Sequence, residues 1–137
     1  MGIVHAEITL KNLIDMSDAE RGIIKDSEVR QTTVSAIVDT GAITLVINED
    51  IRQKLGLKIK GKRRAALADG AARDYEVTEP VSVHWKNRDS LCKAYVMPNS
   101  NQVLLGAIPM EDMDLIVNPA KQELVGAHGD EIVNMLY

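Results

Sequence analysis

The chain has 137 residues, of which 45% are hydrophobic and 26% charged, and its net charge is −4. This composition is typical of a soluble globular protein, and we expect residues 1–137 to form a single domain. A mildly acidic chain with few aromatic residues lacks the charge and the base-stacking platforms of a nucleic-acid binder. No apolar run approaches the roughly 18 residues of a membrane-spanning helix. We therefore expect neither nucleic acid nor a membrane as a partner.

Cysteine and histidine usage narrows the chemistry. Cys92 is the only cysteine, which excludes an internal disulfide, and the N-terminal residues lack the pattern of a secretory signal. Both observations favour a cytoplasmic location. His5, His84 and His128 have no metal-ligand spacing with Cys92 or with one another, so we expect no metal and no other cofactor. Cys92 could act as a nucleophile with His84 as its base, but a buried structural thiol is the simpler interpretation.

The first third of the chain favours strands. Alternating apolar residues over positions 4–10 predict a half-buried strand, and positions 29–38 predict a second. The polar residues 15–28 between them, which include Gly22, predict a loop with room for a short strand at 23–24. A third strand is predicted at 44–47, after the interruption Asp39-Thr40-Gly41-Ala42. Asn48 predicts the N-cap of a short helix over 49–55, which ends at Gly56.

The rest of the chain favours hairpins. Asp69-Gly70 predicts a two-residue hairpin turn between arms at 63–68 and 71–79. Further strands are predicted at 81–85, 91–97 and 103–105, and Pro109 suits the first position of a helix over 109–114. Residues 115–117 and 123–125 predict a last hairpin, and the tail at 127–137 is ambiguous between strand and helix. The fold class is therefore mainly β, with two short helices.

Asp39-Thr40-Gly41 carries the most chemical information. Peptide hydrolysis without a metal or a covalent intermediate needs a water made nucleophilic and a carbonyl made electrophilic. Two adjacent carboxyl groups can do both. Because two negative charges at such short distance repel each other, the pair keeps one proton, so that one group is ionised and the other protonated. The ionised carboxylate accepts the proton of the water and the protonated one donates to the carbonyl. Gly41 permits a sharp turn, and Thr40 supplies a short hydroxyl that can hydrogen-bond across a tight loop.

Residues 37–42 with 45–47 resemble the active-site strand of retropepsin-like (clan AA) aspartic proteases, especially the small bacterial members. Residues 104–106, Leu-Leu-Gly, resemble the second signature of that family, and residues 67–70 fall where the family has its flap hairpin. The resemblance covers about residues 3–125. It implies a compact β-barrel half with a flap hairpin and one or two short helices, a homodimer, and aspartic endopeptidase activity on a protein or peptide substrate. The resemblance also implies roles for single residues. Asp39 is catalytic, and Thr40 and Gly41 support the active-site loop, where Thr40 contacts its counterpart across the two-fold axis. Gly41 and Ala42 line the cleft, and the substrate is bound by Ala42, Ala68, Asp69 and Gly70.

Two features bear on activity and assembly. The chain has one Asp-Thr-Gly, so a carboxylate pair requires a second copy, most simply across a two-fold axis. Segments 2–10 and 115–137 are candidate interface strands, and 127–137 is either such a strand or a tail. Most family members carry Ser, Thr or Asp where this chain has Ile43. This difference leaves an alternative function open, a dimeric module that binds peptides without cutting them. A cluster of basic residues precedes the flap, and we interpret it as a solvated loop; the alternative is a binding surface for an anionic partner. The cluster consists of Lys58, Lys60, Lys62, Arg63 and Arg64.

Overall fold

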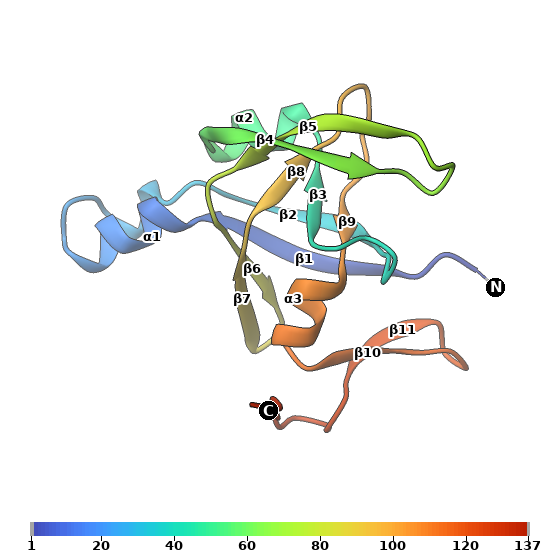
Figure 1. Cartoon of the computed structure of the whole chain (residues 1–137). Helices are drawn as coiled ribbons and strands as arrows, with labels where there is room; N and C mark the ends of the chain where they lie inside the picture. The colour runs from blue at the N-terminus through green and yellow to red at the C-terminus, as the bar shows by residue number, and fades with distance from the viewer. Residues whose placement is uncertain (1, 137) are drawn as a thin grey trace.

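The computed structural model describes residues 2–136 and is mainly β, as the sequence predicts. A nine-stranded sheet has the order β4-β5-β8-β3-β9-β2-β1-β6-β7, and β10 and β11 form a second sheet below it (Figure 1). The strands are β1 (His5–Asn12), β2 (Gln31–Val38), β3 (Leu45–Ile47), β4 (Ile59–Ala66), β5 (Ala72–Thr78), β6 (Val81–Trp85), β7 (Arg88–Cys92), β8 (Ala94–Val96), β9 (Leu104–Leu105), β10 (Leu115–Asn118) and β11 (Glu123–Gly126). The helices are α1 (Leu13–Glu20), α2 (Glu49–Leu55) and α3 (Ala107–Asp112), with one 3-10 turn, η1 (Asp26–Glu28).

The core is aliphatic. β1 lies between β2 and β6, and its Ala6, Ile8 and Leu10 are buried on one face, which confirms the predicted alternation. Because the chain has no Phe, small and branched side chains fill the interior. The largest fully buried apolar side chains are Ile8, Leu10, Leu45, Ile47, Leu55, Leu57, Val81, Val83, Leu105 and Met113.

Residues 13–20 form helix α1, so the predicted loop over 15–28 is wrong there, and residues 23–24 form no strand. Asn12 caps the helix, since its Oδ1 accepts a hydrogen bond from Asp15 N at 2.9 Å and its Nδ2 donates to Leu55 O at 2.8 Å. The Asp15 carboxylate in turn accepts hydrogen bonds from Arg30 N, Nε and Nη2. The helix is thus held by polar contacts to distant residues, which an apolar pattern cannot reveal.

Helix α2 confirms its prediction from local signals. The Asn48 side chain accepts a hydrogen bond from Ile51 N at 2.9 Å, and Gly56 ends the helix in the left-handed conformation, with φ of 64°. Both caps lie within the segment itself, so the sequence pattern determines them.

Hairpin β4–β5, which we call the flap (residues 59–78), projects from the sheet on the same side as the loop between β2 and β3 (Figure 1). The predicted hairpin is confirmed, but a two-residue turn at Asp69-Gly70 is wrong. The turn runs from Leu67 to Gly70, whose N–H donates to Leu67 O at 2.9 Å, and Leu67 N donates to Ala71 O at 2.8 Å. Gly70 has a φ of 86°, so glycine is required one position past the turn centre.

The predicted strand at 91–97 is divided in the structure. β7 begins earlier, at Arg88, and pairs with β6, whereas β8 pairs with β3 and β5 on the other side of the sheet. The break is at Lys93, next to Ala94, whose N–H donates to the buried hydroxyl of Thr78. Residues predicted as one strand therefore form two strands, which pair with different parts of the sheet.

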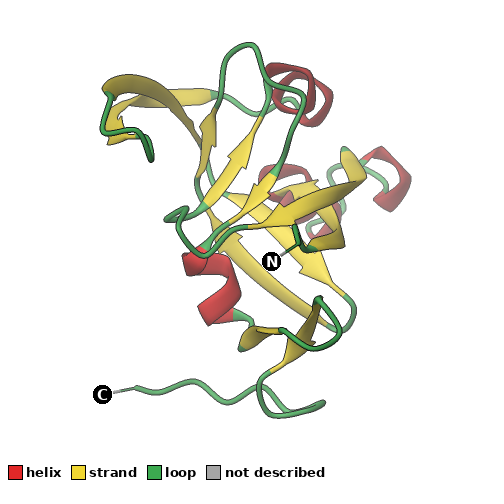
Figure 2. Ribbon diagram, turned by 90° about the vertical axis from the view of Figure 1, so that its right-hand side faces the viewer, coloured by secondary structure: helices red, strands yellow, loops and turns green. Residues whose placement is uncertain are grey.

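The C-terminal region confirms the last hairpin, β10–β11. Helix α3 begins two residues before Pro109, so the prediction that proline opens it is wrong. The tail adopts neither alternative over most of its described length: residues 127–136 run as a loop below the sheets (Figure 2), with one isolated bridge between His128 and Glu131. Residue 137 lies outside the described residues.

Buried Arg88 holds the tail against the body of the protein. Its Nη1 donates to Met113 O at 2.8 Å and to Asp114 O at 2.9 Å, and its Nη2 donates to Gly129 O and Glu131 O. A guanidinium carries five N–H donors in one plane, so it can donate hydrogen bonds to several carbonyl groups at once. Arg88 thus ties the segment after β11 to the body of the protein, together with Asp114, whose carboxylate contacts His128 Nδ1 and accepts a hydrogen bond from Val133 N.

Candidate active site

Asp39 directly follows β2, and its position is set by residues far along the chain. β2 runs parallel to β9, with Ile37 beside Leu104 and Val38 beside Leu105. The N–H of Asp39 donates to Leu105 O at 3.0 Å. The two short sequence signatures therefore lie side by side, and the second supports the first.

Gly106 brings helix α3 against the loop that follows Asp39. A Cβ atom on Gly106 would lie 2.6 Å from Ala42 O and 2.8 Å from Thr44 N, so only glycine fits. This close approach lets Ala107 N donate to Ala42 O at 2.8 Å and Ile108 N donate to Ile43 O at 2.9 Å. The loop of residues 39–44 is thus bonded to residues 105–108 along its length.

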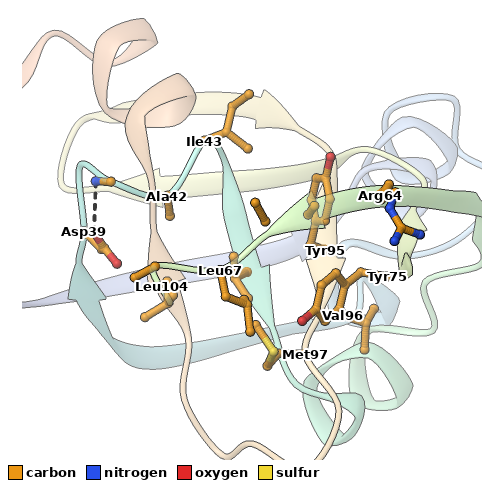
Figure 3. A pocket seen from close by; sticks show the side chains of 15 residues that line it. Asp39, Ala42, Ile43, Arg64, Leu67, Tyr75, Tyr95, Val96, Met97 and Leu104 are labelled. Atoms are coloured by element: carbon orange, nitrogen blue, oxygen red, sulfur yellow. Dashed lines mark hydrogen bonds between the residues drawn. The ribbon is translucent and has the colours of Figure 1, made fainter. Parts of the chain in front are cut away.

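The Asp39 carboxylate is half-buried, and its Oδ1 accepts a hydrogen bond from Gly41 N at 2.9 Å (Figure 3). This bond fixes the orientation of the side chain. Within residues 2–136, Oδ2 has no hydrogen-bond partner, so it is free to meet a ligand or another carboxylate. Thr40 and Gly41 are exposed beside it.

A cavity of about 550 Å³ opens beside Asp39 and beneath the flap. Its size is in the range of ligand pockets, and its walls are mostly apolar side chains from β3, β5, β8 and β9. Figure 3 shows Leu67 of the flap turn over the space that Met97 and Leu104 border. The labelled lining residues are Asp39, Ala42, Ile43, Arg64, Leu67, Tyr75, Tyr95, Val96, Met97 and Leu104.

The structure brings some of the sequence-predicted site residues together and leaves others outside. Asp39, Gly41, Ala42 and Ala68 line the cavity. Thr40 lies on the exposed side of the loop, and Asp69 and Gly70 lie at the tip of the flap, away from the cavity lining.

Sequence reasoning did not identify the aromatic walls, Tyr75 and Tyr95. Ile43, singled out only as a departure from the family, also lines the cavity although its side chain is 64% exposed. A signal existed for Tyr75, since it shares a face of β5 with buried Val77.

Cys92 and His84 do not form a nucleophilic pair. Across the β6–β7 hairpin Cys92 lies opposite Val81, and His84 lies opposite Asp89. Burial raises the pKa of the Cys92 thiol, which disfavours the thiolate, and burial lowers the pKa of His84. The His84 ring contacts the Ser82 hydroxyl at 2.7 Å instead.

The described residues contain neither a metal-ligand cluster nor a membrane-spanning helix. No three His, Cys, Asp or Glu side chains of residues 2–136 are grouped as metal ligands would be. No helix in the same range is long and apolar enough to cross a membrane.

A mainly β fold, with an Asp-Thr-Gly loop braced by Leu-Leu-Gly and a flap hairpin over the adjacent cavity, is the retropepsin-like fold of aspartic proteases. The family model described as gag-polyprotein putative aspartyl protease matches residues 26–123, which is most of the chain and contains the loop, the flap and residues 104–106. The chain belongs to this family. No curated protein that was compared matches the chain.

Proposed function

We propose that the protein is an aspartic endopeptidase that acts as a homodimer, with Asp39 of each copy contributing one carboxylate. The observation that carries the proposal is the position of Asp39, oriented by Gly41 at the edge of an apolar cavity beneath a hairpin. A cavity with these walls suits the side chains of an extended peptide, and the flap would cover it.

In the proposed mechanism the two carboxylates share one proton, because like charges at short distance cannot both ionise. The ionised carboxylate accepts a proton from water as the oxygen forms a bond to the substrate carbonyl carbon. The protonated carboxylate donates to the carbonyl oxygen. The C–N bond then breaks as the leaving nitrogen takes a proton from one carboxyl group of the dyad. A hydroxyl of the tetrahedral intermediate gives its proton to the other carboxylate as the new carbonyl forms, which restores the shared proton.

The homodimer is part of the proposal because the chain carries one Asp-Thr-Gly. A two-fold axis beside Asp39 would bring the same loop against itself. The exposure of Thr40 supports this arrangement, since its hydroxyl is available to a partner. Thr40 and Gly41 would then support the paired loops. Ala42 and Ala68 would contact substrate in the cavity, and Asp69 and Gly70 would reach it only when the flap closes.

The proposed location is the cytoplasm, and the proposed substrates are proteins or peptides rather than nucleic acid or membranes. The free thiol of Cys92 and the net charge of −4 support these choices.

A second candidate function is a dimeric module that binds peptides without cutting them. Ile43 favours it, because an exposed apolar side chain stands where a polar residue would contact the substrate backbone. The two functions share the cavity and differ in the fate of the bound peptide.

The test is to incubate the purified protein with denatured proteins and a peptide library between about pH 4 and 7, where a carboxylate dyad titrates. We expect cleavage that Asp39→Asn reduces by more than about a hundredfold, the scale of a lost general acid or base. Asp50→Asn, which removes an exposed carboxylate in the first turn of α2, is the matched control and should cleave normally. Peptide binding without cleavage would favour the second function, and an active monomer by solution mass would overturn the dimer.

A further inference from the structure

A second cavity, of about 140 Å³, adjoins the cavity beside Asp39. The two share Ile43 and Tyr95 as lining residues, so the cleft continues past Ile43. In Figure 3 the Ile43 side chain and the Tyr95 hydroxyl point to the same side, away from Leu67 and Met97. The remaining lining residues of the smaller cavity are Thr44, Arg63, Cys92, Lys93 and Ile108.

The charged side chains that line this smaller cavity are both cations. Arg63 comes from flap strand β4 and Lys93 from the break between β7 and β8, and both are exposed. Neither forms an ion pair with any of residues 2–136, whereas neighbouring Arg64 pairs with Asp74 at 3.5 Å. Arg63 lies opposite Tyr75 in the flap, which places it on the face that covers the cleft.

The floor of the cavity is apolar and fixed. The main-chain N–H of Ile108 donates a hydrogen bond to Ile43 O at 2.9 Å. The Thr44 hydroxyl donates to Lys93 O at 3.0 Å, which holds the Lys93 backbone in place. No acidic residue among residues 2–136 lines the cavity; Asp112 of α3, whose charge acts on Cys92, lies outside its lining. An occupant with an aliphatic stem and an anionic end fits these surroundings.

An extended peptide offers such an occupant at a defined spacing. Alternate side chains of a strand point to the same side, so the residue two positions from the one in the larger cavity would enter the smaller one. Resting on the proposed function, we propose that the smaller cavity is an outer subsite that selects an acidic substrate side chain, glutamate before aspartate. Arg63 and Lys93 are the residues that determine this specificity.

The test compares two fluorogenic peptides that differ only by Glu or Gln, two positions from a large apolar residue at the scissile bond. The wild-type protein should show a kcat/KM about 5- to 30-fold higher for the Glu peptide, as expected for two solvent-exposed charge contacts. The preference should shrink as salt is raised. Arg63→Gln/Lys93→Gln should cleave both peptides equally.

Lys62→Gln is the control, because this substitution removes one positive charge next to Arg63 at a residue that lines neither cavity. It should keep the Glu preference. Equal cleavage of both peptides by the wild-type protein, or a preference that survives in the double variant, would overturn the inference.

A second readout separates this inference from the proposed function. Asp39→Asn protein is titrated with the labelled Glu and Gln peptides, and binding is measured by fluorescence anisotropy. Tighter binding of the Glu peptide, lost in the Arg63/Lys93 double variant, supports the subsite even if no peptide is cut. Cleavage of neutral peptides without any Glu preference supports the endopeptidase and overturns the subsite.

Discussion

Gly106 and Ala42 approach so closely that a side chain cannot fit between them, since a Cβ atom on Gly106 would lie 2.6 Å from Ala42 O. This contact, 64 residues apart in the chain, brings the second signature onto the loop that bears Asp39. It makes glycine at position 106 a requirement of the geometry of the Asp39 loop, and not only of the turn into α3.

Gly106→Ala should therefore displace the loop of residues 39–44. We expect a loss of about 3 kcal/mol in the free energy of unfolding, since the clash is with backbone that cannot rotate away. Peptide cleavage should fall more steeply than the folded fraction, because the hydrogen bond from Asp39 N to Leu105 O is strained as well. Urea unfolding and cleavage of one fluorogenic peptide measure the two effects. Gly61→Ala is the control, as a Cβ there would have no atom within 4 Å, and equal behaviour of the two variants would contradict the prediction.

The Asp15–Arg30 ion pair should make stability depend on acid pH. The hydrogen bond from the Arg30 side chain lowers the pKa of Asp15 below its ordinary value of 3.8. Since the folded pKa is the lower one, the stabilisation is fully present above about pH 4 and is lost as the pH falls through the folded pKa. Asp15→Asn should cost about 1–2 kcal/mol near pH 6, and this difference should shrink below pH 3.8.

Urea unfolding from pH 2.5 to 6 measures this difference. Asp26→Asn, which removes an exposed carboxylate without an ion pair in the described part of the chain, should give a curve parallel to the wild type. A cost for Asp15→Asn that stays constant down to the lowest pH would be inconsistent with the lowered pKa.

Arg88→Lys should loosen the tail, which would keep its contacts with Asp114. An ammonium cannot reach four carbonyl groups from two separate segments, so we expect a loss of about 2–4 kcal/mol from unsatisfied buried acceptors. Amide hydrogen exchange at residues 127–134 should accelerate more than exchange in β1. Arg73→Lys, at an exposed position of the flap, is the control. Unchanged exchange in the tail would show that other contacts hold it.

Asn48→Ala should weaken helix α2. The Asn48 side chain is buried and caps Ile51 N, so its removal should cost about 1 kcal/mol, as for other N-caps. Thermal unfolding by circular dichroism measures the cost. Asn101→Ala, in the exposed loop after β8, should leave the melting temperature unchanged, and equal shifts for both variants would contradict a capping role.

The features that the sequence predicts correctly are those determined within a few residues. Helix α2 carries both of its caps, and Asp39-Thr40-Gly41 is recognisable as a local signature. Helix α1 was not predicted because its stabilising partner, Arg30, lies 15 residues from Asp15. The division of residues 88–96 into two strands likewise depends on which distant strands each half pairs with.

The same limit applies to the site. The carboxylate could be located from the sequence, but its surroundings could not. Tyr75 and Tyr95 reach one cavity because β5 and β8 are neighbours in the sheet, with Val77 beside Tyr95. The approach of Arg63 to Lys93 depends on how the flap covers the body of the protein. A pattern of alternating residues gives the face of each strand but not the strand that lies beside it.

The pairing of β2 with β9 has a consequence for the order of events during synthesis. Ile37, Asp39 and Ala42 all bond to residues 103–107, which leave the ribosome about 65 residues later. A nascent chain that ends before Leu104 carries the whole Asp-Thr-Gly loop without the backbone that holds it. For the endopeptidase proposed above, this order means that hydrolytic competence arises only late in translation, so that an unfinished polypeptide could not digest itself or its neighbours.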